Sequence, residues 1–71
     1  MSEYLPYQQR VVDEQNALAE KVVALAAFFD GEVFPTLPNY EQQLLVMQFN
    51  NMTAYGLVLQ MRIENFNKEM S

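Results

Sequence analysis

A chain of 71 residues is long enough for one domain, and its composition excludes several classes of protein. It has no cysteine and no histidine, which rules out disulfides and argues against a transition-metal site. Nine acidic residues against four basic ones give a net charge of −5, the wrong sign for binding DNA, RNA or an anionic membrane surface.

The same composition favours association between copies of the chain. Hydrophobic residues make up 51% of it, yet ordering each residue costs about 1.5 kcal/mol, which a core of this size barely offsets. Without disulfides or a metal, oligomerisation is the remaining means of stabilisation. The chain has no apolar run of about 18 residues, as a membrane span would need, and no cationic leader before an apolar run. We therefore expect a cytoplasmic protein with no membrane partner.

A first helix is expected from about Pro6 to Phe29. Pro6 suits the first position of a helix, and Asp30-Gly31 is expected to end it with a left-handed glycine. Apolar residues recur at helical spacing, with Gln15 as the polar gap, and a second apolar line runs beside the first. The first line is Val11, Leu18, Val22, Leu25 and Phe29; the second is Val12, Ala19, Val23 and Ala26. Together they cover roughly half of the helix surface, more than one partner helix can cover.

Residues 30–39 are expected to form the connection, because two prolines in four residues prevent helix continuation. Val33, Phe34 and Leu37 are apolar, so this segment is expected to fold back over one end of the molecule. Asn39 is expected to cap the second helix, with Gln42 completing a capping box.

A second helix is expected from about Tyr40 to Asn67. Its inner line is expected to alternate steps of three and four residues: Leu45, Gln48, Met52, Tyr55, Leu59, Arg62 and Phe66. Leu44, Met47, Ala54, Val58 and Met61 form a flanking line. Gly56 inside this helix suggests a close backbone approach. The predicted fold is all-α: one domain over residues 1–71, an antiparallel two-helix hairpin that assembles into a homo-oligomer.

A turn centred near residues 34 and 35 predicts which positions face each other. The predicted pairs include Leu18 with Met52, Gln15 with Tyr55, and both Tyr7 and Gln8 with Arg62. The amide of Gln15 and the phenol of Tyr55 would satisfy each other's hydrogen bonds.

Catalysis is not expected. Asp13, Glu14 and Glu20 are the carboxylates that could do acid–base chemistry, but they lie mainly on the polar side of the first helix and read as a solvated face. The sequence shows no nucleophile–base arrangement, and two glycines cannot make a phosphate-binding loop. We expect no catalytic residue, no metal and no cofactor.

The cations differ in their local surroundings. Arg10 has Asp13 and Glu14 three and four residues on, so a local ion pair would explain it. Lys21 and Arg62 have no acidic residue at those spacings, and Arg62 interrupts the expected apolar line. A cation in that position needs either a ligand or a carboxylate of another chain.

Tyrosines accompany these cations. Tyr4 and Tyr7 lie near Arg10 and are expected opposite Arg62. An aromatic ring with guanidinium groups can hold a base and a phosphate. The alternative is that these tyrosines only pack at a helix end with an exposed hydroxyl.

The run from Leu5 to Glu14, Leu-Pro-Tyr-Gln-Gln-Arg-Val-Val-Asp-Glu, resembles the opening of a family of small phage proteins. The spacing onward to Lys21-Val22 matches, as do Leu44-Leu45, Gln48, Met52, Tyr55, Leu59, Arg62-Ile63 and Phe66. Over nearly the whole chain this resembles the helical-hairpin domain shared by anti-CBASS and anti-Thoeris sponge proteins. Those proteins sequester cyclic oligonucleotide messengers of bacterial immunity without cleaving them. The most specific part is the run over residues 7–14.

This resemblance implies a hexamer-like assembly in an infected cell, with pockets for cyclic di- or trinucleotides where chains meet. The ligand-binding residues would be Tyr7, Gln8, Arg10, Lys21 and Arg62, with Tyr7 stacking on a base and the cations facing phosphates. Anti-Thoeris members add a β-rich domain that binds a cyclic ADP-ribose isomer; this chain has none, so that ligand is not implied. The alternative is an oligomeric hairpin that acts as a protein-binding inhibitor or structural module.

Overall fold

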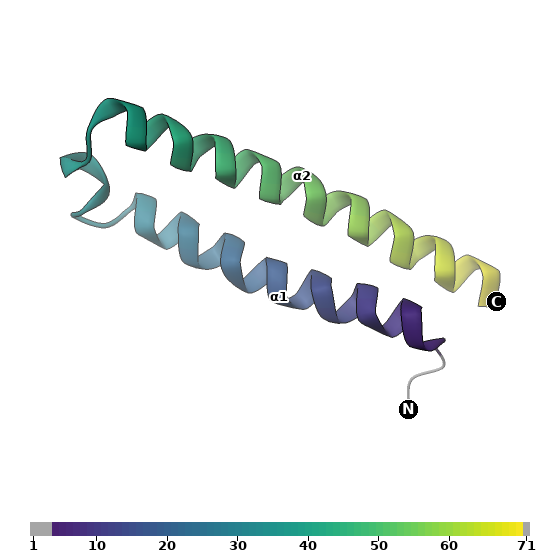
Figure 1. Cartoon of the computed structure of the whole chain (residues 1–71). Helices are drawn as coiled ribbons and strands as arrows, with labels where there is room; N and C mark the ends of the chain where they lie inside the picture. The colour runs from purple at the N-terminus through teal and green to yellow at the C-terminus, as the bar shows by residue number, and fades with distance from the viewer. Residues whose placement is uncertain (1–3, 71) are drawn as a thin grey trace.

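The computed structural model describes residues 4–70 of the chain, and the side chains of residues 4–68. It consists of α1 (Pro6–Phe29), the short 3₁₀ helix η1 (Phe34–Thr36) and α2 (Asn39–Met70). The two long helices run antiparallel and make a rod of 49 × 19 × 15 Å (Figure 1). No strand occurs in residues 4–70, which confirms the all-α hairpin. The second helix continues three residues beyond the expected Asn67.

The first turn of α1 is held by Gln8. Leu5 precedes the helix with an extended backbone and Pro6 begins it, as proline favours. The Gln8 side-chain oxygen accepts the backbone N–H of Leu5 at 2.9 Å, and Gln8 is only 5% exposed. One of the N–H groups left unpaired at a helix start is thereby satisfied.

The end of α1 differs from the expected left-handed cap. Within residues 4–70 no glycine has a positive φ, so the prediction for Gly31 is wrong. Instead Asp30 keeps a right-handed conformation, and its N–H donates to the carbonyl of Ala27 at 3.2 Å. Gly31 donates to Phe28 in the same way, at 3.1 Å. The last turn therefore tightens to i→i−3 bonds, which satisfy the terminal carbonyls without a left-handed residue.

The connection folds back over the end of the hairpin, as expected. The Phe34 ring lies 4.9 Å from the Phe29 ring, edge to face, and 6.3 Å from the Phe28 ring. The Gln42 amide nitrogen donates to the carbonyls of Phe34 at 3.1 Å and Leu37 at 3.0 Å. The helix α2 begins at Asn39, and the Gln42 backbone N–H donates to the Pro38 carbonyl at 3.0 Å, so Pro38 and not Asn39 precedes the helix and the predicted capping box is wrong.

The inner line of α2 has a different phase from the predicted one. Leu45, Met52, Leu59 and Phe66 belong to both phases, and the remaining inner positions are Phe49, Gly56 and Ile63. Gln48, Tyr55 and Arg62 were predicted there and are exposed. The structure chooses the phase that buries a phenylalanine and an isoleucine and leaves an amide, a phenol and a guanidinium in water.

The register is displaced by about one helical turn from the predicted pairing. Leu18 lies against Gly56, whose missing Cβ would sit 3.6 Å from Leu18 Cδ2, so the approach is between a side chain and the backbone. Tyr7 packs on Phe66, four residues beyond the Arg62 predicted to face it. The η1 turn and the helix start at Asn39 move α2 relative to the simple turn that was assumed.

The buried core lies at the open end of the hairpin. Among the described side chains, the buried apolar residues are Val11, Leu59 and Phe66, with Tyr4, Leu18 and Ile63 packed around them. Many large apolar side chains remain exposed: Leu5, Tyr7, Val23, Val33, Tyr40, Leu44, Val46, Met47, Tyr55, Leu57, Val58 and Met61. This surplus is the physical basis of the predicted self-association, which stays a prediction.

Candidate functional site

One side of the hairpin gathers most of the candidate ligand residues. Tyr7, Arg10, Glu14 and Lys21 follow one another at steps of three, four and seven residues, so they share one side of α1. Tyr55 and Arg62 are seven apart and share one side of α2. The Tyr55 hydroxyl donates to the Glu14 carboxylate, which joins the two sides into one surface. We call this surface the aromatic–cationic face; it comprises Tyr7, Arg10, Glu14, Lys21, Tyr55 and Arg62.

Phe66 organises the open end of this face. The ring of Tyr7 meets it edge to face, with centroids 5.8 Å apart and planes at 82°. The Tyr4 ring meets it at 6.4 Å, and the Tyr4 hydroxyl donates to Asn67 Oδ1 at 2.9 Å. The Arg62 guanidinium carbon lies 6.0 Å from the Phe66 centroid, at the limit of a cation–π contact. Tyr7 and Arg62, predicted to be neighbours, are brought together on the same ring.

The Tyr55–Glu14 pair replaces the predicted pair of Tyr55 with Gln15. The hydrogen bond to Glu14 raises the pKa of Tyr55 above its ordinary value of 10.0, and desolvation and the negative charge of Glu14 add to it. The positive charge of Arg62 acts in the opposite direction. Gln15 lies half-buried between the helices, so the predicted pairing is wrong by one residue, about 100° around α1.

Three cations remain without carboxylate partners in the structure. Among residues 4–68, Arg10, Lys21 and Arg62 form no ion pair. The predicted local pair of Arg10 does not form; Asp13 instead accepts from Gln9 at 3.0 Å, and Glu14 accepts from Tyr55. Arg62 is exposed and does not interrupt the inner line, so its charge carries no desolvation penalty. These cations are free to meet a ligand or another chain.

Gln8 stands apart from the other candidate residues. It is buried, next to Tyr7 in sequence but about 100° away around α1. Its oxygen is used by the Leu5 N–H. In the single chain Gln8 therefore has a structural role at the helix start.

Sequence reasoning missed Glu14 as part of this face and Phe66 as the buried ring that Tyr7 packs against. Glu14 was read as a solvated carboxylate, and Phe66 only as an apolar position of the inner line. The signal available was the shared spacing of Glu14 with Tyr7, Arg10 and Lys21, which becomes informative only once the phase of α2 is known.

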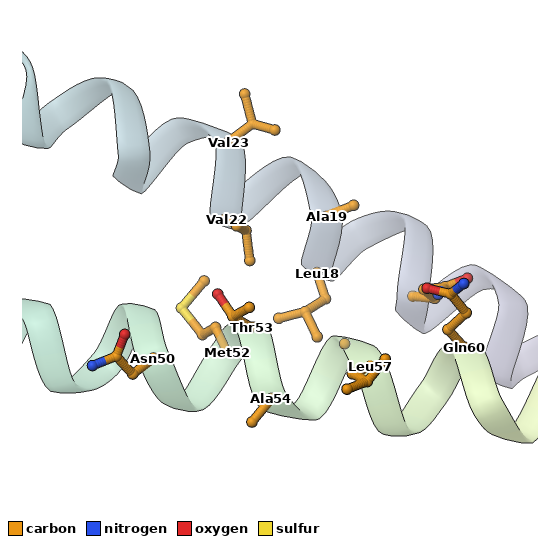
Figure 2. A pocket seen from close by; sticks show the side chains of 12 residues that line it. Leu18, Ala19, Val22, Val23, Asn50, Met52, Thr53, Ala54, Leu57 and Gln60 are labelled. Carbon is orange, nitrogen blue, oxygen red and sulfur yellow. The ribbon is translucent and has the colours of Figure 1, made fainter.

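A groove with no charged lining lies on the other side of the hairpin (Figure 2). Ala19 and Val23 line it from α1, two residues and about 200° away from Lys21. Its volume is about 630 Å³, and its full lining is Gln15, Leu18, Ala19, Val22, Val23, Asn50, Met52, Thr53, Ala54, Gly56, Leu57 and Gln60. A second hollow of about 570 Å³ lies near the connection, beside Phe34 and Met47.

Other kinds of site are absent from the described part of the chain. Residues 4–70 contain no cluster of three metal-binding side chains. Neither long helix there has the length and apolarity of a membrane-crossing segment.

Comparison with known proteins identifies the family of the chain. The family model described as Sequestin matches residues 5–65, so the chain belongs to the Sequestin family. A relative from Enterobacteria phage T4 is 40% identical over 62 residues, which cover 87% of this chain and 97% of the phage protein. That relative is described as an uncharacterized 7.5 kDa protein in the denB-rIIB intergenic region. No solved structure matches the chain.

Proposed function

We propose that this protein is a phage anti-defence sponge that binds cyclic di- or trinucleotides and sequesters them uncleaved in the cytoplasm of the infected cell. The observation that carries the proposal is the aromatic–cationic face, where Arg10, Lys21 and Arg62 lack carboxylate partners beside an exposed Tyr7. The family name, which denotes sequestration, and the phage relative support it.

The side chains of the face suit the two parts of a cyclic nucleotide. Tyr7 is 48% exposed and meets Phe66 edge to face, so its ring can stack on a base. The guanidinium groups of Arg10 and Arg62 can each bind a phosphate with two parallel N–H donors. Lys21 adds a compact positive charge.

The spacing of the cations favours a pocket shared between chains. Lys21 lies eleven residues after Arg10, so the two are about 16 Å apart along α1. One chain therefore spreads its cations along the rod. Copies placed side by side would gather cations of different chains around one pocket and make it locally positive, although each chain carries a net charge of −5. We accordingly propose a homo-oligomer, and a hexamer on the basis of the resemblance.

The proposed role is binding without catalysis. On the aromatic–cationic face the described carboxylate is Glu14, and it is hydrogen-bonded to the Tyr55 hydroxyl. A phenol held in its protonated form by a carboxylate is a poor nucleophile, and neither group is placed to activate water in the single chain. The bound nucleotide would be released intact on unfolding.

Titration calorimetry with a panel of cyclic di- and trinucleotides tests this proposal. We expect saturable heat with at least one of them, and its recovery unchanged, by mass spectrometry, after the protein is denatured. Arg62→Ala should abolish binding, whereas Lys68→Ala, which removes the same charge outside the face, should not. A folded oligomer that gives no heat with any member of the panel would overturn the proposal.

A protein-binding or structural role is the second candidate, and the exposed apolar side chains of α2 favour it. Leu44, Met47 and Val58 are exposed on a chain of net charge −5, a surface that could dock on another protein. Recovery of one stoichiometric host protein, together with no nucleotide heat, would favour this function over the first.

A further inference from the structure

Phosphate binding does not explain the carboxylate of Glu14 on the aromatic–cationic face. Among residues 4–68, Glu14 forms no ion pair, so its charge is not neutralised within the chain. Arg10 precedes it by four residues on the same side of α1, about 6 Å along the helix. A negative charge at that distance opposes a phosphate held by Arg10. A face that bound phosphates alone would bind them better without Glu14.

The hydrogen bond between the helices does not account for the charge either. The Tyr55 hydroxyl donates to the Glu14 carboxylate, and the amide oxygen of a glutamine can accept the same bond. Glutamine has the same side-chain length and carries no charge. The contact with Tyr55 therefore explains a polar acceptor at this position, but not a carboxylate.

Most of the carboxylate stays available for a ligand. An ionised carboxylate has about four lone-pair sites on its two oxygens, and the Tyr55 hydroxyl bonds to one oxygen, Oε2. The Glu14 side chain is exposed. Glu14 is therefore a pair of acceptors, held in place by Tyr55, that can receive two N–H donors lying side by side, as a carboxylate does from arginine.

Among the nucleic-acid bases, guanine presents such a pair of donors. Its Watson–Crick edge carries N1–H and the N2 amino group next to each other. Adenine and cytosine place one donor beside an acceptor, and uracil places its N–H between two acceptors. A carboxylate therefore forms two charge-assisted hydrogen bonds with guanine and meets a repelling lone pair on each of the others.

We propose that Glu14 binds the Watson–Crick edge of guanine, so that the protein prefers cyclic nucleotides that contain this base. The inference rests on the proposed function, because it concerns the same face and the same class of ligand. The order along α1 suits a cyclic dinucleotide, with Tyr7 at one base, Arg10 at a phosphate and Glu14 at the other base. Glu14 lies seven residues after Tyr7, about 10 Å along the helix, and the two bases of such a ligand lie on opposite sides of its sugar–phosphate ring.

Calorimetry with cyclic di-GMP and cyclic di-AMP tests the inference, because these ligands have the same ring and charge and differ only in their bases. The natural protein is compared with Glu14→Gln, which keeps an acceptor for Tyr55 but loses the charge. The matched control is Asp13→Asn. Asp13 is exposed, accepts from Gln9 and lies about 100° from Glu14 around α1, so its variant removes the same charge outside the face. The ratio of the two Kd values cancels the general effect of charge on phosphate binding.

We expect the natural protein to bind cyclic di-GMP more tightly than cyclic di-AMP by roughly tenfold or more. In Glu14→Gln this preference should be lost or reversed, because a glutamine amide pairs well with adenine. Asp13→Asn should keep the preference. Equal affinity of the natural protein for the two ligands, or an unchanged preference in Glu14→Gln, would overturn the inference.

A change in the ligand gives a second measurement that needs no variant. Cyclic di-IMP carries hypoxanthine, which keeps the N1–H of guanine and lacks its N2 amino group. The natural protein should bind it less tightly than cyclic di-GMP by roughly tenfold, and equal binding would overturn the inference. Heat from cyclic nucleotides without any preference for guanine would leave the proposed function standing, whereas no heat from any of them would overturn both.

Discussion

At the scale of single residues, the Tyr55–Glu14 hydrogen bond makes the stability of the hairpin depend on pH in the alkaline range. The bond raises the folded-state pKa of Tyr55 above 10.0, so folding favours the protonated phenol. The stabilisation is fully present below the unfolded pKa and is lost as the pH rises through the folded pKa. We expect the urea midpoint to fall between pH 9 and pH 11.5, measured by circular dichroism.

Two variants isolate the contribution of this hydrogen bond to the pH dependence. Tyr55→Phe removes the phenol and Glu14→Gln removes the charge that holds its proton. Both should make the midpoint less dependent on pH above 10. An identical pH dependence in the natural protein and in Tyr55→Phe would show that this hydrogen bond does not contribute.

Prediction from sequence was uneven at this scale. Tyr7 and Arg62 were predicted to lie together, and the structure joins them through Phe66. The partner of Tyr55 was predicted wrongly, because Gln15 and Glu14 differ by only 100° around α1 and the choice depends on how α2 is rotated. The rotation of one helix against another is a property of packing that no single residue encodes.

At the scale of elements, Gln42 ties the connection to α2. Gln42→Ala would remove the side-chain donor to the Leu37 carbonyl and one of the two donors to the Phe34 carbonyl, which also accepts from the Leu37 N–H at 3.1 Å. We expect a loss of about 1–2 kcal/mol in the free energy of unfolding. Gln43→Ala, the exposed neighbour, is the matched control and should change stability by less than about 0.5 kcal/mol. Equal losses in urea denaturation would contradict the role given to Gln42.

A substitution at Gly56 is expected to stabilise the hairpin, in contrast to Gln42→Ala. Glycine inside a helix costs about 1 kcal/mol relative to alanine, and an alanine Cβ here would make an ordinary 3.6 Å contact with Leu18. Gly56→Ala should therefore raise the free energy of unfolding by about 1 kcal/mol, and Ala54→Gly should lower it by a similar amount. A destabilised Gly56→Ala would mean that another backbone approaches this position in the assembled protein.

The two helices were predictable from the sequence, because apolar periodicity extends over many turns and two prolines mark the connection. The exact helix ends and the inner positions of α2 were harder to predict. Steps of three-four and four-three share every second position, and the polarity of Gln48 and Arg62 beside the apolar Phe49 and Ile63 was the signal that favoured the observed phase. The predicted caps were wrong because α1 ends with i→i−3 bonds and α2 begins at Asn39 itself.

At the scale of the whole molecule, the salt dependence of association distinguishes an apolar interface from one built on ion pairs. Raising NaCl from 0.1 to 1 M shortens the Debye length from about 10 to about 3 Å and screens repulsion between acidic chains. We expect the sedimenting mass, a multiple of 8.3 kDa, to stay the same or increase. A mass that falls with salt would indicate that Lys21 and Arg62 pair with carboxylates of neighbouring subunits.

The position of Phe66 couples recognition to folding. Hairpin ends usually fray first, yet here the tightest packing lies at the open end, and the ring that seals it is also the ring that Tyr7 and Arg62 touch. A molecule that grips Tyr7 or Arg62 would hold the two helix ends closed. Ligand binding should therefore raise the melting temperature. Ligand at one hundred times its Kd would add about 2.7 kcal/mol to the free energy of unfolding, a change that a thermal melt detects without any label.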